Sequence, residues 1–109
     1  MSLKRVASVV GLDPDKEMAY RELHRKVWPE VLEVLVSAGV TNYSIFLRDS
    51  LLFSYFEFVG DDYESAMAGI ASDKTTKEWW KLTEPCQRPL PSTGDGEWWA
   101  NADEVFHLD

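Results

Sequence analysis

The residues best suited to chemistry in this chain are a histidine and several tyrosines and tryptophans. Tyr20 and His24 lie four residues apart in the stretch YRELHRKVWPE, which spans residues 20–30. Side chains at this spacing project from one face of an α-helix, so the phenol and the imidazole can share a cavity. An imidazole takes up and releases protons near neutral pH. The pair therefore indicates acid/base chemistry, although an isolated histidine on an apolar helix face is more often structural and bonded to a backbone carbonyl.

Other aromatic residues could complete a binding site. Trp79 and Trp80 are adjacent, so they cannot both face one side of a helix, and one must point towards a partner or a pocket. Tyr43 lies in a strand-like run. Each of these residues alone is more often part of the core or the surface. Together, aromatic faces for sugar C–H groups, phenols for hydroxyls and an imidazole for proton transfer are typical of a site for a neutral carbohydrate.

Composition and missing motifs exclude several function classes. The 11 Lys and Arg residues against 19 Asp and Glu give a formal charge of −8, which opposes binding to nucleic acid. His24, His107 and Cys86 do not have zinc-ligand spacing, and no glycine-rich phosphate loop occurs, so we expect neither a metal nor another cofactor. No apolar run is long enough to span a membrane, and no signal peptide is recognisable. We expect a cytoplasmic protein.

The elements that must position these residues follow from hydrophobic periodicity and from turn residues. Residues 4–10 predict a first strand and residues 14–38 a helical region. Within that region Pro29 predicts either a kink or the start of a second helix, and Gly39 predicts its end. Further elements follow in order: strands 41–47 and 51–59 forming a hairpin, helices 63–71 and 74–83, a surface loop 85–97, and a last strand 104–108.

The hairpin decides which side chains share a face with Tyr43. If the turn centres near Asp49, the pattern places Tyr43 on one face with Phe53, Tyr55 and Glu57. A slip of one residue would exchange the two faces of a strand. The assignment therefore depends on the length of the turn.

The element order is β-α-β-β-α-β, which predicts an α+β, ferredoxin-like fold with one antiparallel sheet and helices on a single face. The chain is expected to form a single domain over residues 1–109, with residues 85–103 rich in loops. An uncovered apolar sheet face is too large a patch for a monomer, so we expect a homodimer through the sheet face.

Several separate motifs then point to one family. These are Tyr20 with H-x-x-x-W-P-E from His24, the run GVTNYSI at 39–45, LLF at 51–53 with Glu57, WWK at 79–81 and the closing EVFxL at 104–108. In these motifs the chain resembles the L-rhamnose mutarotase family over about residues 4–108. The resemblance implies a dimeric α+β barrel that interconverts the α and β anomers of a 6-deoxy-hexose without a cofactor.

The resemblance also implies roles for individual residues. His24 corresponds to the family's catalytic histidine, and Tyr43 to one of its sugar-site residues. From the chemistry of mutarotation we expect Tyr43 or Tyr20 to be the catalytic partner of His24. Tyr20, Trp79 and Trp80 correspond to substrate-binding residues for a neutral monosaccharide. Residues 85–103, which include Trp98 and Trp99, match no family motif, so L-fucose or another deoxy-sugar stays open as the substrate.

Two other function classes remain alternatives. Dimeric α+β barrels also host cofactor-independent monooxygenases and haem-degrading enzymes, an argument from fold alone. A non-catalytic module that binds a small molecule would need no titratable group. Only the mutarotase needs His24 and neutral hydrogen-bonding groups in one cavity.

Overall fold

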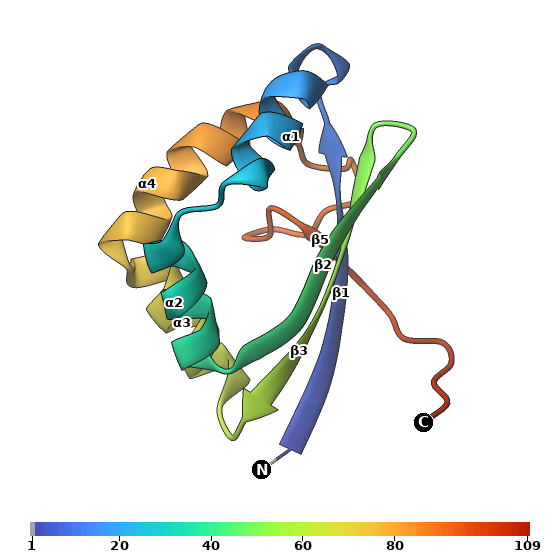
Figure 1. The fold of residues 1–109 in the computed structure, drawn as a ribbon. Helices are drawn as coiled ribbons and strands as arrows, with labels where there is room; N and C mark the ends of the chain where they lie inside the picture. Colours follow the sequence, from blue (N-terminus) through green and yellow to red (C-terminus); the bar gives the residue numbers. More distant parts are fainter. Residues whose placement is uncertain (1) are drawn as a thin grey trace.

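The computed structural model describes residues 2–109 and shows one antiparallel sheet with helices on a single face (Figure 1). The strand order is β2-β3-β1-β4, and β5 also pairs with β1, so the predicted ferredoxin-like α+β fold is confirmed. The strands are β1 (Ser2–Leu12), β2 (Val40–Arg48), β3 (Leu51–Gly60), β4 (Gln87–Arg88) and β5 (Ala100–Ala102).

The helices run along the chain between these strands. They are the 3-10 turn η1 (Pro14–Lys16), α1 (Glu17–Arg25), α2 (Pro29–Ala38), α3 (Tyr63–Ser72), α4 (Lys74–Thr83) and the 3-10 turn η2 (Glu84–Cys86). Asp73 caps α4, because its carboxylate accepts a hydrogen bond from the backbone N–H of Thr76 at 2.9 Å. None of the helices within residues 2–109 combines the length and apolarity that a membrane span requires.

The expected break at Pro29 separates two helices. α1 ends at Arg25, and Pro29 is the first residue of α2, where its missing N–H leaves no hydrogen bond unmade. Gly39 ends α2 in a left-handed conformation with φ of 103°. His24 therefore lies in the last turn of α1, next to the break.

The hairpin turn is shorter than the sequence suggested, so the predicted face of Tyr43 is wrong. Asp49 and Ser50 alone form the turn, with φ of 53° and 59°, and Arg48 pairs with Leu51. Positive φ at both positions is the geometry of a two-residue hairpin turn. The register moves by one residue relative to a longer loop and exchanges the faces of the two strands.

Tyr43 consequently lies on the face that the helices cover. It packs against Phe56 of β3, with ring centroids 5.4 Å apart, and Ile45 lies beside Ser54 on the same face. The ladder is irregular between Thr41 and Ser44. Such a bulge redirects the side chains on either side of it.

The end of the chain also differs from the expectation. The last strand of the chain is Ala100–Ala102, which pairs with β1, and residues 104–108 form no strand. The last residues leave the sheet on the side opposite the helices (Figure 1), and Val105 is 96% exposed. The alternation of polar and apolar residues in EVFHL indicated a strand. Such a run forms a strand only where the edge of a sheet is free to pair with it. Within the predicted loop, Gln87–Arg88 adds a short strand to β1.

The most deeply buried cluster lies where the segment that follows α4 meets α1 and the sheet. It consists of Val10, Leu12, Tyr20, Leu52 and Cys86, with Trp99 packed against it. Tyr20 is thus both a core residue and a neighbour of His24. The core holds one wall of the candidate site in place.

Candidate active site

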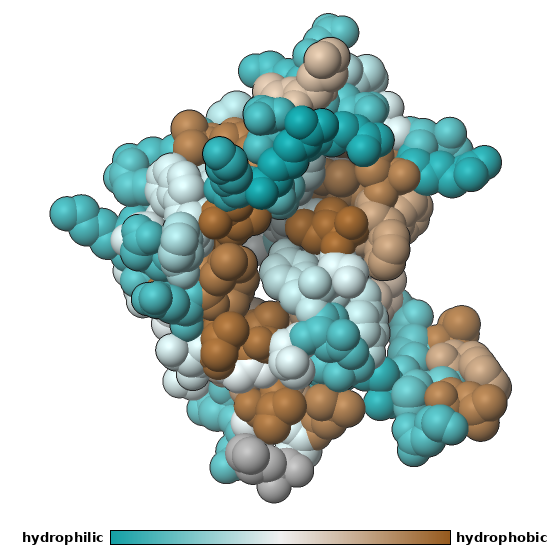
Figure 2. Space-filling view, viewed as in Figure 1, coloured by the Kyte–Doolittle hydropathy of each residue, from teal (hydrophilic) through white to brown (hydrophobic). Residues whose placement is uncertain are grey.

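Three of the candidate residues, Tyr20, His24 and Trp79, lie together, whereas Tyr43 packs against Phe56 on the sheet. The space-filling view shows apolar side chains bordering a recess between the helix layer and the sheet (Figure 2). A cavity of about 570 Å³ between α2 and β2 has Tyr43 in its wall, but none of Tyr20, His24, Trp79 and Trp80. Another hollow, of about 520 Å³, lies between α2 and α3 and contains none of the candidate residues. The inner face of the sheet is therefore the side on which to look for a ligand.

An aromatic cluster surrounds His24. Its ring lies against that of Tyr20, with centroids 4.3 Å apart and planes inclined by 33°. Trp79 from α4 meets the other side of His24 edge-on at 5.5 Å, and Trp28 contacts Trp79 at 5.3 Å. Two segments that are distant in sequence, residues 20–28 and α4, thus fix the plane of the imidazole. The structure brings Tyr20, His24 and Trp79 together, as expected for one site.

A backbone hydrogen bond sets the proton arrangement on His24. Its Nδ1 lies 2.9 Å from the carbonyl oxygen of Tyr20, one helical turn earlier. A carbonyl oxygen only accepts hydrogen bonds, so the neutral imidazole must carry its proton on Nδ1. Nε2 is then the atom with a free lone pair. A structural histidine makes the same backbone contact, and the contact leaves Nε2 as the nitrogen that could act as a base.

The Tyr20 hydroxyl belongs to a chain of hydrogen bonds. Gln87 Nε2 donates to it at 3.2 Å, and the indole Nε1 of Trp98 donates to Gln87 Oε1 at 2.8 Å. Burial raises the pKa of Tyr20 to about 12, and the Tyr43 phenol adds to the rise. Tyr20 therefore stays neutral at physiological pH and can offer a proton in a hydrogen bond.

Tyr43 contributes from the opposite layer. Burial raises the pKa of its phenol, so this group also stays protonated, although 44% of the whole residue is exposed. Part of the residue is therefore open to solvent or to a ligand. Tyr20, by contrast, is packed in the core next to His24.

Comparison with known proteins shows to which family this chain belongs. A family model described as L-rhamnose mutarotase matches residues 5–108. The L-rhamnose mutarotase of Oceanobacillus iheyensis is 32% identical over 98% of this chain and 100% of its own length. That of Pectobacterium atrosepticum is 36% identical over 96% of this chain and 98% of its own length. The chain belongs to the L-rhamnose mutarotase family. It is therefore a carbohydrate isomerase that interconverts anomers.

Solved structures agree with this membership. The crystal structure of an L-rhamnose mutarotase from Formosa agariphila matches with a TM-score of 0.77 and 27% identity, covering 97% of this chain and 99% of that one. The tetracenomycin F2 cyclase of Streptomyces glaucescens has a TM-score of 0.74 at 15% identity, with 97% of both chains covered. The second likeness shows the fold alone. The family match favours a mutarotase over the monooxygenase and binding-module alternatives.

Within this mutarotase-family site, the expected residues and the residues found differ in part. Trp79 is buried and faces His24, whereas the structure records no aromatic contact between Trp80 and His24 within residues 2–109. Trp28 joins the cluster; its place in the H-x-x-x-W-P-E motif was the available signal. Gln87 had no such signal, because it lies among prolines in a segment that matches no motif.

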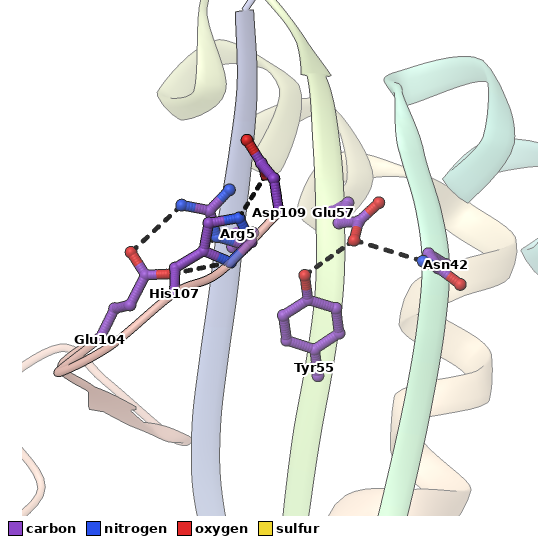
Figure 3. Close-up of polar contacts among 7 residues, drawn as sticks. All are labelled: Arg5, Asn42, Tyr55, Glu57, Glu104, His107 and Asp109. Carbon is purple, nitrogen blue, oxygen red and sulfur yellow. Dashed lines mark hydrogen bonds and ion pairs between the residues drawn. The ribbon is translucent and has the colours of Figure 1, made fainter.

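The opposite face of the sheet carries a separate polar network (Figure 3). There the Tyr55 hydroxyl donates to Glu57 at 2.8 Å, and Asn42 donates to the same carboxylate. The remaining contacts join Arg5 to Glu104 at 2.6 Å and His107 to Asp109 at 2.7 Å. The bond from Arg5 lowers the pKa of Glu104, and that from His107 lowers the pKa of Asp109. His107 and Glu57 therefore lie on the face away from His24.

Proposed function

We propose that this chain interconverts the α and β anomers of L-rhamnose, or of a closely related 6-deoxy-hexose, at the cluster around His24. The observation that supports this most is the hydrogen bond from Nδ1 of His24 to the Tyr20 carbonyl, which leaves Nε2 free as a base. The family match supports the choice of sugar. Net negative charge does not oppose a neutral substrate.

The reaction requires two proton movements in each direction. Nε2 of His24 takes the proton from the anomeric hydroxyl, the bond between C1 and the ring oxygen breaks, and the imidazolium gives that proton to the ring oxygen, which becomes the C5 hydroxyl. The result is an open-chain aldehyde. Rotation about the C1–C2 bond presents the other face of the aldehyde to the C5 hydroxyl. The ring then closes as the protons return, so His24 ends unchanged and no other reactant is consumed.

The neighbouring aromatic residues divide the remaining tasks. Both phenols have raised pKa values, so each can donate a hydrogen bond without losing its proton. We assign Tyr43 or Tyr20 as the hydrogen-bond donor to the sugar oxygen that His24 does not contact at each step. Trp79 supplies an aromatic surface beside the imidazole for the apolar side of the sugar, with Trp80 as a further predicted contact.

We further propose a homodimer that forms through the open sheet face. Phe46 and Phe53 pair across β2 and β3 on that face, and 63% of Phe46 is exposed. Exposed aromatic side chains on a sheet surface favour burial against a second copy. We place the enzyme in the cytoplasm, which accords with a buried free thiol at Cys86.

Saturation-transfer NMR between the two anomers tests the proposed function. Wild-type protein is mixed with L-rhamnose, L-fucose or another 6-deoxy-hexose, and the exchange rate is measured. His24→Ala should lose about 10² to 10⁴ of the acceleration, which is the usual contribution of general acid/base catalysis. His107→Ala is the matched control, because this histidine lies on the opposite face and should leave the rate unchanged.

Each outcome addresses a different part of the proposal. If wild-type protein accelerates exchange for no 6-deoxy-hexose, the proposed function is wrong. If exchange is accelerated but His24→Ala retains the full rate, the role of His24 is wrong. A selective effect on one sugar identifies the substrate.

A further inference from the structure

We propose that Gln87 and Trp98 are positioning residues that direct the phenolic proton of Tyr20 towards the sugar. The inference rests on the proposed function, since it assigns a task within the same site. It uses two residues from the segment that matched no family motif. Within residues 2–109, no hydrogen bond or ring pair joins either residue to His24, so their effect on catalysis is expected to pass through Tyr20.

The direction of the chain follows from the chemistry of its members. An indole N–H only donates, so the atom of Gln87 that faces Trp98 at 2.8 Å must be the carbonyl oxygen. The amide nitrogen of Gln87 is then the atom that faces Tyr20, and it donates to the phenolic oxygen at 3.2 Å. If the amide were flipped, two donors would face each other at Trp98. The indole thereby fixes the orientation of the amide.

The orientation of the amide in turn fixes the Tyr20 hydroxyl. Because that oxygen accepts from Gln87, its own hydrogen must point elsewhere, and the structure records no acceptor for it within residues 2–109. Both side chains are buried, with Tyr20 5% and Gln87 9% exposed. A buried hydroxyl with one unused hydrogen is prepared to donate to an incoming oxygen. A sugar oxygen next to His24 is the acceptor that the proposed reaction provides.

The charged residues nearest to Gln87 and Trp98 along the chain are Glu84, Arg88 and Glu97, and the Glu97 carboxylate accepts from Gly94 and Asn101. The imidazole of His24 lies against the Tyr20 ring, and the phenol of Tyr43 and the thiol of Cys86 act on Tyr20 electrostatically. The nearest ion pair along the chain joins Arg88 to Asp13 at 3.1 Å. A substitution at Gln87 that reverses the hydrogen bond should therefore act mainly on Tyr20.

Gln87→Glu provides that reversal. An ionised carboxylate only accepts hydrogen bonds, so Tyr20 would donate to it and turn its proton away from the sugar. Protonation of the new carboxyl group at lower pH restores a donor. We expect the kcat of the variant to be about one tenth of the wild-type kcat near pH 8. The ratio of the two kcat values should rise towards one near pH 5.

Three companion variants separate positioning from folding. Trp98→Phe removes only the indole donor and should lower kcat by about 2- to 10-fold with little change in KM, because the amide is then free to rotate. Trp99→Phe is its matched control: this neighbour packs on the core, and its variant should show the wild-type pH profile. In a Tyr20→Phe background, Gln87→Glu should have no further effect on kcat.

The outcomes are read in the anomer-exchange assay, with circular dichroism to verify folding. A pH-independent ratio for folded Gln87→Glu would overturn the inference, as would an undiminished effect of that substitution in the Tyr20→Phe background. If Gln87→Glu does not fold, Trp98→Phe decides alone: wild-type kcat would refute the inference. A wild-type protein without exchange activity would instead refute the proposed function.

Discussion

Removal of the Tyr20 hydroxyl tests whether this residue of the candidate site also stabilises the core. Tyr20→Phe retains the ring that lies against His24 and the carbonyl that holds Nδ1. It leaves the Nε2 donor of Gln87 without its partner in a place where little water has access. An unsatisfied buried donor costs about 1–3 kcal/mol, so the free energy of unfolding should fall by that amount. For a domain of this size each kcal/mol lowers Tm by about 4–8 °C.

Urea denaturation at a fixed protein concentration measures this loss. Tyr55→Phe is the matched control, because its hydroxyl donates to Glu57, whose carboxylate keeps a second hydrogen bond from Asn42 when the phenol is lost. Tyr20→Phe combined with Gln87→Leu should regain part of the stability, since replacing both partners leaves no orphaned donor between them. Wild-type stability in Tyr20→Phe, or a larger loss in Tyr55→Phe, would refute the reasoning.

Three further predictions concern the frame of the molecule. Gly39→Ala should lower the free energy of unfolding by at least about 1–3 kcal/mol in urea denaturation, because φ is 103° and a Cβ would lie 2.4 Å from the Val59 carbonyl oxygen. Arg5 lowers the pKa of Glu104, so the ion pair between them stabilises the fold fully above the usual carboxyl pKa. This stabilisation is lost as pH falls through the lowered pKa. Glu104→Gln should therefore flatten the decline of Tm on the acid side. Phe46→Asp should shift the protein from dimer to monomer in sedimentation velocity, since it places a charge on the open sheet face.

The sequence was sufficient for the parts of the fold that rest on local rules. Pro29 and Gly39 mark helix ends through their backbone properties, which neighbouring residues do not alter. The hairpin register was not accessible in the same way. It depends on Ser50 adopting a positive φ, which is unusual for serine and is imposed by the pairing of the flanking strands.

The candidate site shows a similar division. Tyr20 and His24 could be related from sequence, because helical spacing alone places them on one face. The contact of Trp79 with His24 needed the packing of α4 against the end of α1. Gln87 and Trp98 could not be anticipated, since their hydrogen bond joins two points of an irregular segment whose path follows no periodicity.

The attachment of that segment to the sheet has a consequence for the motions of the protein. β4 and β5 join β1 through ladders of only two and three residue pairs, whereas β1 and β3 share ten. Short ladders open at lower free energy than long ones, so the amides of Ala100–Ala102 should exchange with solvent deuterium sooner than those of β3. A sugar held by Tyr20 favours the closed form and slows this exchange. Occupancy of the site can then be followed from a few backbone amides, even in a variant that performs no chemistry.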